Sequence, residues 1–445
     1  MQSLIENAIN EFKKIDKPIR IISHIDCDGI AAASILIKAF VREDKKFILS
    51  NVKQITPDLL KEIALEPYKV IFFTDIGSGY LNLIDKYLKN HKIFILDHHI
   101  PENLNNYENI THINPHLTKD NIKISGAGVA YLFAKALNPK NKDMAHIALV
   151  GMSGDIIELN KEILNDAISE GKIEVNYGLK IFGAQTRPLH KILQYSTDPY
   201  IPGVTGSEEG AINFLNELGI NLIENNNYKK LTNLTQEELK KLTTAIILKR
   251  LGSEKNPEDI FGEVYLLKQE DNESLTKEVR EFSTLLNCCG RMDKPTLGIG
   301  TCLDNNSIKE KAFELAKAYK AELINNLNWF YNNKEKLIQD KNFVIINAEN
   351  NIKDSMIGTL ASIISKSNIY PDGTMILAMA YTLDDNVKIS MRGCNTEIDL
   401  RKLLIQITGN LGEAGGHKYA CGTLIKMEDE QRFINNSISI LSKVK

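Results

Sequence analysis

The sequence has no long hydrophobic run, few cysteines and almost no net charge. No uncharged apolar stretch approaches the roughly 18 residues that span a membrane. The six cysteines include no CxxC pair, which argues against a zinc ribbon or a disulfide framework and favours reduced thiols in a cytoplasmic protein. A formal net charge of −3 argues against coating nucleic acid by bulk electrostatics, although a local basic groove stays open.

Two common nucleotide-binding signatures are also absent. The chain has no GxxxxGK[ST] motif, and Tyr131 stands where the third glycine of GxGxxG would follow Gly126 and Gly128. We therefore reject a P-loop and a Rossmann dinucleotide site. Ser125 is instead expected to begin a helix that packs beside the functional site or meets phosphate with its amides.

The length of 445 residues indicates two or three domains, and 43% hydrophobic residues is typical of a soluble globular protein. Short β-rich runs alternate with helical patterns in the N-terminal part, which predicts an α/β fold with a parallel sheet covered on both faces. The expected strands are 19–23, 70–74, 93–96 and 112–114. The expected helices are 30–40, 81–89, 125–137 and 144–152.

A second, smaller α/β unit is expected from residue 343 onward. Its predicted strands are 343–347, 374–381, 387–391 and 420–425, and its predicted helices are 355–367 and 399–407. We expect three segments: a domain with the functional site (1–190), a helical connector (191–325) and a second α/β domain (326–445).

Acidic residues and histidines follow three of the expected strands. These residues are His24, Asp26 and Asp28 after the first strand, Asp75 after the second, and Asp97, His98 and His99 after the third. Asp155 follows a helical run and is the fourth such position. In an open parallel sheet, ligands bind outside the carboxyl ends of the strands, so these side chains are expected to converge. A single such aspartate could simply cap a helix, but four groups of acidic or histidine residues in this order favour a functional site.

Several carboxylates in one place repel one another unless cations compensate them. Mixed carboxylate and imidazole ligands suit Mn²⁺, and carboxylate-rich sites also take Mg²⁺. Two such cations can stabilise the attacking and leaving oxygens of a phosphoryl displacement. The pattern therefore predicts two divalent cations, with Mn²⁺ preferred and Mg²⁺ accepted, in an enzyme that hydrolyses phosphoesters.

The motifs resemble those of a known family. HIDCDG (24–29), TDIG (74–77), DHH (97–99) and SGD (153–155) resemble the four metal-binding motifs of the DHH phosphoesterases. The first of these, together with SGAG (125–128) and NCCGRM (287–292), resembles the RecJ-like exonuclease branch, and DPYIPG (198–203) its archaeal group. SMRG (390–393) and GEAGGH (412–417) resemble the arginine strand and the glycine–histidine loop of the associated DHHA1 domain.

The resemblance implies a role for each residue. One metal is held by His24, Asp26 and Asp75, and the other by Asp28, Asp75, His98 and Asp155, with Asp75 as the bridge. Asp97 supports the site, and His99 faces the phosphate or the leaving group. The implied substrate-binding residues are Ser125, Arg291, Arg392, Gly415, Gly416 and His417. The structural alternatives are ion pairs for the two arginines and a capped turn for the glycine–histidine loop.

The resemblance implies a metal-dependent exonuclease for single-stranded DNA or RNA that acts in replication or repair. A substrate that enters between the two α/β parts would be single-stranded. Likeness to the shorter archaeal members favours 3′→5′ digestion. Two alternatives remain: a phosphodiesterase for small substrates, such as a nano-RNase or a nucleotide phosphatase, and a subunit of a replicative helicase complex. The implied partners are single-stranded nucleic acid and a helicase or replisome subunit, without a membrane.

Overall fold

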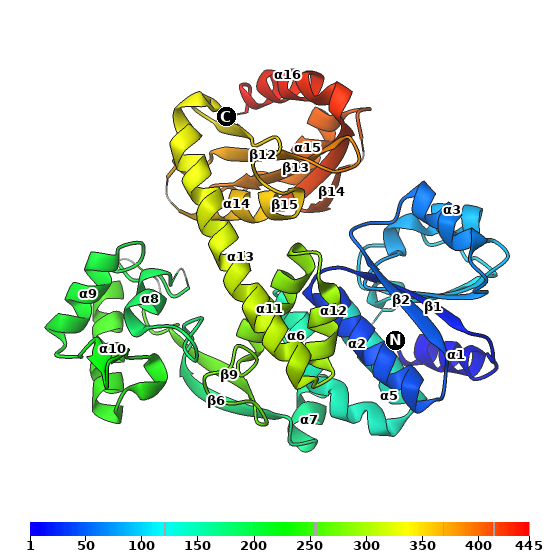
Figure 1. The fold of residues 1–445 in the computed structure, drawn as a ribbon, viewed down its shortest axis with the longest axis horizontal. Coiled ribbons are helices and arrows are strands. Elements are labelled where there is room, and N and C mark those ends of the chain that lie inside the picture. Colours follow the sequence, from blue (N-terminus) through cyan, green and yellow to red (C-terminus); the bar gives the residue numbers. More distant parts are fainter. Residues whose placement is uncertain are drawn as a thin grey trace. The chain divides into compact units, whose positions relative to one another are not determined.

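The computed structural model describes residues 1–119, 122–196, 198–251, 254, 256–367, 369–412 and 414–444, so Glu413 of the glycine–histidine loop lies outside the described residues. The chain divides into two compact units, Met1–Ala316 and Lys317–Lys445, each with its own sheet (Figure 1). All six cysteines are buried free thiols. Among the described residues, no helix has the length and apolar character needed to cross a membrane.

The first unit is built around a parallel sheet with the strand order β2-β1-β3-β4-β5. The strands are β1 (Ile19–His24), β2 (Phe47–Val52), β3 (Val70–Thr74), β4 (Lys92–Leu96) and β5 (Ile110–Ile113). The helices before and between them are α1 (Gln2–Phe12), α2 (Cys27–Arg42), α3 (Pro57–Leu65) and α4 (Leu81–Leu88). Two further helices, α5 (Gly126–Leu137) and α6 (Ala145–Gly154), follow β5.

Both faces of this sheet are buried, which explains why its strands are almost continuously apolar. On β3, Phe72 packs into a core with side chains of α1, α2 and α5. Its neighbours Ile71 and Phe73 point to the opposite face, where α3 and α4 supply the partners. The predicted α/β fold with a doubly covered parallel sheet is therefore confirmed. β2 and α3 were not predicted, because the half-exposed side chains of β2 form no apolar run.

The middle of the chain contains more than a connector. After α7 (Lys161–Ser169), β6 (Ile173–Leu179) pairs antiparallel with β9 (Phe261–Leu267). Between them lie α8 (Leu189–Gln194), α9 (Glu208–Glu217), the β7 (Ile223–Glu224) and β8 (Asn227–Tyr228) hairpin, and α10 (Gln236–Arg250). These elements enclose a separate core. The following helices, α11 (Val279–Arg291) and α12 (Pro295–Cys302), pack into the main core of the first unit, although the expected connector included them.

The second unit has a mixed sheet in the order β10-β11-β12-β13-β15-β14. Among its described strands, β11 and β12 pair in parallel and the other neighbours pair antiparallel. The strands are β10 (Ile338–Asp340), β11 (Phe343–Asn347), β12 (Met375–Tyr381), β13 (Asn386–Gly393), β14 (Ala414–His417) and β15 (Ala420–Lys426). α13 (Asn306–Asn333) leads into it, α14 (Asp354–Lys366) packs on β12 and β13, and α15 (Leu400–Thr408) and α16 (Glu430–Leu441) share its main core. The glycine-rich segment expected as a loop forms the edge strand β14.

Candidate metal centre

Three neighbouring strands place donor side chains at one edge of the parallel sheet. β1, β3 and β4 lie side by side, and their last aligned residues are Ser23, Thr74 and Leu96. The next residues in the chain are His24, Asp75 and Asp97. Strand register therefore brings three of the motifs together, as the strand-end rule predicts. The fourth motif lies at the end of α6, which contacts α2 and has Asp155 as its C-cap residue.

His24, Asp26 and Asp75 form a first group whose donor atoms all lie within 4.8 Å of one another. His24 Nδ1 is 3.0 Å from Asp26 Oδ2 and 3.5 Å from Asp75 Oδ2. Asp26 also caps α2, because its Oδ1 accepts a hydrogen bond from the Gly29 amide. The start of the helix thus fixes one oxygen of Asp26, while the other faces His24.

Asp28, Asp75, His98 and Asp155 form a second group within the same 4.8 Å limit. His98 Nε2 is central to it, at 3.1 Å from Asp155 Oδ2, 3.5 Å from Asp75 Oδ1 and 3.9 Å from Asp28 Oδ2. The two groups contain the same residues that the family resemblance assigns to two metals. A further overlapping group joins Asp75 and His98 with Asp97 and His99.

Asp75 is common to these groups and uses a different oxygen in each of the first two. Oδ2 faces His24 and Oδ1 faces His98, and within the described part of the chain both buried oxygens lack a hydrogen bond of normal geometry. Most buried polar atoms in proteins do have such a partner. The backbone of Asp75 has a φ of 57°, in the left-handed region that residues other than glycine seldom adopt. A Cβ at Gly126 would lie 2.6 Å from Asp75 Oδ1, so the start of α5 packs directly against the Asp75 side chain.

The carboxylates of this centre are too close together to ionise without compensation. Burial, with Asp28 and Asp26 nearby, raises the pKa of Asp75 well above its usual value. Burial, with Asp28 nearby, also raises the pKa of Asp155 to about 6. Burial alone would lower the pKa of His98, but its contacts with Asp155 and Asp75 raise it to about 12. The donor set therefore fits divalent cations, which would neutralise this concentration of negative charge.

Asp28 is fixed by the N-terminus of α5. Its Oδ1 accepts hydrogen bonds from the Ser125 hydroxyl at 2.6 Å and the Ala127 amide at 3.1 Å, and its Oδ2 accepts one from the Gly126 amide at 2.6 Å. Helix amides and the helix dipole both favour a negative charge at this point. Ser125 is fully buried, and its hydroxyl positions Asp28 by donating this hydrogen bond. A direct contact of Ser125 with substrate stays a prediction.

Asp97 stabilises the DHH segment through hydrogen bonds. Its Oδ1 accepts hydrogen bonds from the His98 and His99 amides and lies 2.8 Å from His99 Nδ1, while its Oδ2 accepts one from the Ser78 amide. Although burial opposes ionisation, His99 and these donors keep the pKa of Asp97 far below its usual value. Burial would lower the pKa of His99, but Asp97 raises it to about 9. The supporting carboxylate thus orients the ring of His99 and not that of His98.

A polar network behind His99 was not predicted from the sequence. Asn114 Nδ2 donates to the His99 carbonyl at 2.8 Å and to Ser78 Oγ at 2.9 Å, and Ser78 Oγ lies 2.8 Å from His112 Nε2. Burial lowers the pKa of His112 to about 4, which favours the neutral form of its ring beside Ser78. Asn114 directly follows β5, so the strand-end rule could have identified it. Ser78 carries no comparable sequence signal.

The NCCGRM segment supports the first motif from α11. Asn287 Oδ1 accepts a hydrogen bond from the Cys27 amide at 3.1 Å. A Cβ at Gly290 would lie 2.0 Å from the Ile25 carbonyl oxygen, so only glycine allows this approach. Arg291 follows as the exposed last residue of α11. The structure therefore places Arg291 directly after Gly290, which contacts the HIDCDG loop.

The remaining predicted substrate residues lie in the second unit. Arg392, on β13, donates from Nε to Ser362 Oγ at 2.9 Å and from Nη1 to the Met391 carbonyl at 2.8 Å. Gly415, Gly416 and His417 are exposed on β14, which forms a hairpin with β15. Gly416 has a φ of 111°, which favours glycine. Phosphate binding by these residues stays a prediction.

Three family models match separate parts of the chain. The DHH family, N-terminal domain, matches residues 18–152, the DHH-CID domain matches 181–261 and the DHHA1 domain matches 340–443. These matches support the DHH/DHHA1 superfamily. The DHH match contains every donor of the two groups except Asp155, the DHH-CID match coincides with the separate helical core, and the DHHA1 match contains Arg392 and His417.

Similar proteins cover almost the whole chain. An uncharacterized protein of Methanocaldococcus jannaschii is 29% identical over 443 residues, which is 96% of this chain and 93% of that protein. The crystal structure of exonuclease RecJ bound to manganese has a TM-score of 0.59 and 14% identity, and the match covers 100% of this chain and 94% of that chain. CDC45 from Entamoeba histolytica has a TM-score of 0.64 and 14% identity, with 99% and 98% covered. At such identities, these structures show a shared fold.

Proposed function

We propose that this protein is a metal-dependent phosphodiesterase that digests single-stranded DNA from one end, with RNA as a second candidate substrate. The observation that carries the proposal is the pair of donor groups that share Asp75 through its two oxygens. The DHH and DHHA1 matches support phosphoester hydrolysis, and the structural neighbour RecJ is named as an exonuclease. A role in replication or repair rests on that likeness.

Two divalent cations, preferably Mn²⁺ and otherwise Mg²⁺, would supply charge stabilisation for the attacking and leaving oxygens at phosphorus. His24, Asp26 and Asp75 would hold one of them. Asp28, Asp75, His98 and Asp155 would hold the other. The α5 N-terminus and the helix cap at Asp26 keep these carboxylates in place before any ligand arrives, which lowers the cost of organising the site.

His99 would act on the substrate itself. Asp97 holds ring atom Nδ1, which leaves the opposite nitrogen, Nε2, to donate a hydrogen bond to a phosphate or leaving-group oxygen. Arg291, Arg392 and His417 would bind further phosphates, since the planar guanidinium group of arginine matches phosphate oxygens in pairs. Gly415 and Gly416 would let the backbone approach the ligand closely.

Two other functions remain candidates. A phosphodiesterase for small substrates, such as a nano-RNase or a nucleotide phosphatase, would use the same metal centre on a shorter ligand. A subunit of a replicative helicase complex is favoured by the likeness to CDC45. The complete donor set favours an active enzyme, which could also serve as a replisome subunit.

The test is digestion of end-labelled single-stranded DNA and RNA in Mn²⁺, with one end or the other chemically blocked. We expect stepwise 3′→5′ shortening of single strands and overhangs, with blunt duplex nearly inert. Cleavage of dinucleotides alone would support the small-substrate alternative. No Mn²⁺-dependent cleavage of any of these substrates would contradict the enzymatic proposal.

A further inference from the structure

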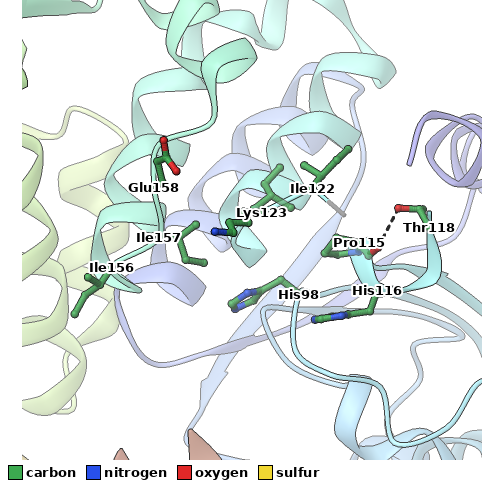
Figure 2. A pocket seen from close by; sticks show the side chains of 10 residues that line it. His98, Pro115, His116, Thr118, Ile122, Lys123, Ile156, Ile157 and Glu158 are labelled. Carbon is green, nitrogen blue, oxygen red and sulfur yellow. Dashed lines mark hydrogen bonds between the residues drawn. The ribbon is translucent and has the colours of Figure 1, made fainter. Parts of the chain in front are cut away.

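A pocket of about 580 Å³ adjoins the candidate metal centre (Figure 2). His98, whose Nε2 belongs to the second donor group, is one of its lining residues. The rest of the lining comes from two segments, one between β5 and α5 and the other directly after α6. Figure 2 shows His98 and His116 along one side of the pocket, with Ile122 and Lys123 opposite them. None of the roles proposed above uses this space.

The lining combines apolar walls with a few polar groups. Ile122 and Ile157 are partly buried against the main core, and Ile156 completes the apolar side. The exposed His116 and Lys123 contribute an imidazole ring and an ammonium group. A nucleobase has matching properties, because its flat faces pack on apolar and aromatic side chains while its edge accepts hydrogen bonds.

Ile156 is an independent sign that this wall is functional. It directly follows the metal-group residue Asp155, and 91% of its surface is exposed. Its φ of 58° lies in the left-handed region, which is strained for a β-branched residue. A polar residue such as asparagine would suit both the backbone and the solvent better. An exposed isoleucine on a strained backbone beside this pocket is a candidate for contact with a ligand.

We propose that this pocket binds the base of the nucleotide whose phosphate lies at the metal centre. The inference rests on the proposed function, because it assumes that a phosphoester occupies the donor groups. The volume suits one nucleoside, within the usual range for small-ligand pockets of roughly 300–1,000 Å³. His116 and the isoleucines would pack on the base, and Lys123 would donate to an oxygen on its edge. The enzyme would thereby distinguish nucleotides from phosphoesters that have no base.

Binding can be measured separately from hydrolysis. Calorimetry in Mn²⁺ would compare thymidine 5′-monophosphate with 2-deoxyribose 5-phosphate, which carries the same phosphate and sugar without a base. We expect the nucleotide to bind at least about tenfold more tightly. Ile156→Asn and Lys123→Met should each weaken nucleotide binding by about threefold or more and leave the base-free ligand unchanged. Leu65→Asn and Lys89→Met, at exposed positions outside the pocket, are matched controls.

Each outcome has one meaning. Equal affinity of the two ligands for the unmodified protein would overturn the pocket proposal, and so would a variant that loses both ligands equally. The thermal midpoint of Ile156→Asn should stay level or rise, because asparagine tolerates the left-handed backbone; a fall would indicate a structural role for Ile156 and contradict the proposal. If the nucleotide is preferred but no strand is digested in Mn²⁺, the exonuclease proposal fails while the base pocket stands.

Discussion

The two units hold their candidate functional groups in different ways. In the first unit, Asp28 and Asp75 are buried, and the α5 N-terminus fixes their positions. The Asp75 oxygens have no ordinary hydrogen-bond partner among the residues that the structure describes. In the second unit, Arg392 is only half-buried and bonds Ser362 and its own strand, and Gly415 and His417 are exposed on an edge hairpin. A strained, unsatisfied acidic centre suits chemistry, whereas exposed donors suit binding along a chain of phosphates.

Mutations in the two units are therefore expected to have different effects. Changes in the first unit should alter metal content and turnover, and changes in the second should alter substrate affinity and its dependence on salt.

Asp75→Asn should reduce turnover by at least about a thousandfold, because it removes the charge shared by both donor groups. Asparagine tolerates the left-handed backbone, so the fold should survive. In a metal chelator, the variant should melt at the same temperature as the unmodified protein or higher, because one repelling carboxylate is gone. Mn²⁺ should raise the melting temperature of the unmodified protein more than that of the variant.

Activity assays and thermal melts with and without Mn²⁺ check this prediction. Near-normal digestion by a folded Asp75→Asn protein would contradict the two-metal account.

Gly126→Ala and Gly415→Ala compare the two units at glycine positions. A Cβ at Gly126 would lie 2.6 Å from Asp75, whereas no atom of the described residues lies within 4 Å of a Cβ at Gly415. We expect about a hundredfold loss of turnover for Gly126→Ala, through displacement of the shared carboxylate. Gly415→Ala should leave the melting temperature unchanged and weaken only substrate binding. Equal turnover losses in both variants, measured at saturating substrate, would argue against the division between units.

Asp97→Asn should lower turnover by about ten- to a hundredfold, because His99 loses its orienting partner. Metal content, measured by elemental analysis, should remain close to normal. His99→Ala should have a similar effect, and the double variant should be no worse than either single one. Additive losses would show that the two residues act independently.

Arg392→Ala should have the smallest effect on chemistry. We expect weaker single-strand binding and a salt dependence whose slope falls by about one, as for the loss of one phosphate contact. Metal content should not change. Arg432→Ala, an exposed arginine of α16, is the matched control in the same unit. Unaltered affinity at several salt concentrations would assign Arg392 a structural role through Ser362 and Met391.

The sequence predicts which donor side chains the structure brings together, because its signals are local. Each donor stands beside the apolar strand or helix that positions it, and the strand-end rule then brings the motifs together. Because these signals are local, the sequence did not predict contacts between distant segments. Asn287 reaches Cys27 across 260 residues, and β6 pairs with β9 across the inserted helices. No periodicity records such pairings, and the glycine-rich β14 carries too few side chains to be recognised as a strand.

The central claim is that two divalent cations bind this chain and share Asp75. A titration of the metal-free protein with Mn²⁺, followed by electron paramagnetic resonance, measures their number directly. We expect two bound ions per chain for the unmodified protein, loss of one in Asp26→Asn, and weakened binding of both in Asp75→Asn. Two ions bound by Asp75→Asn with undiminished affinity, or fewer than two by the unmodified protein, would contradict the account.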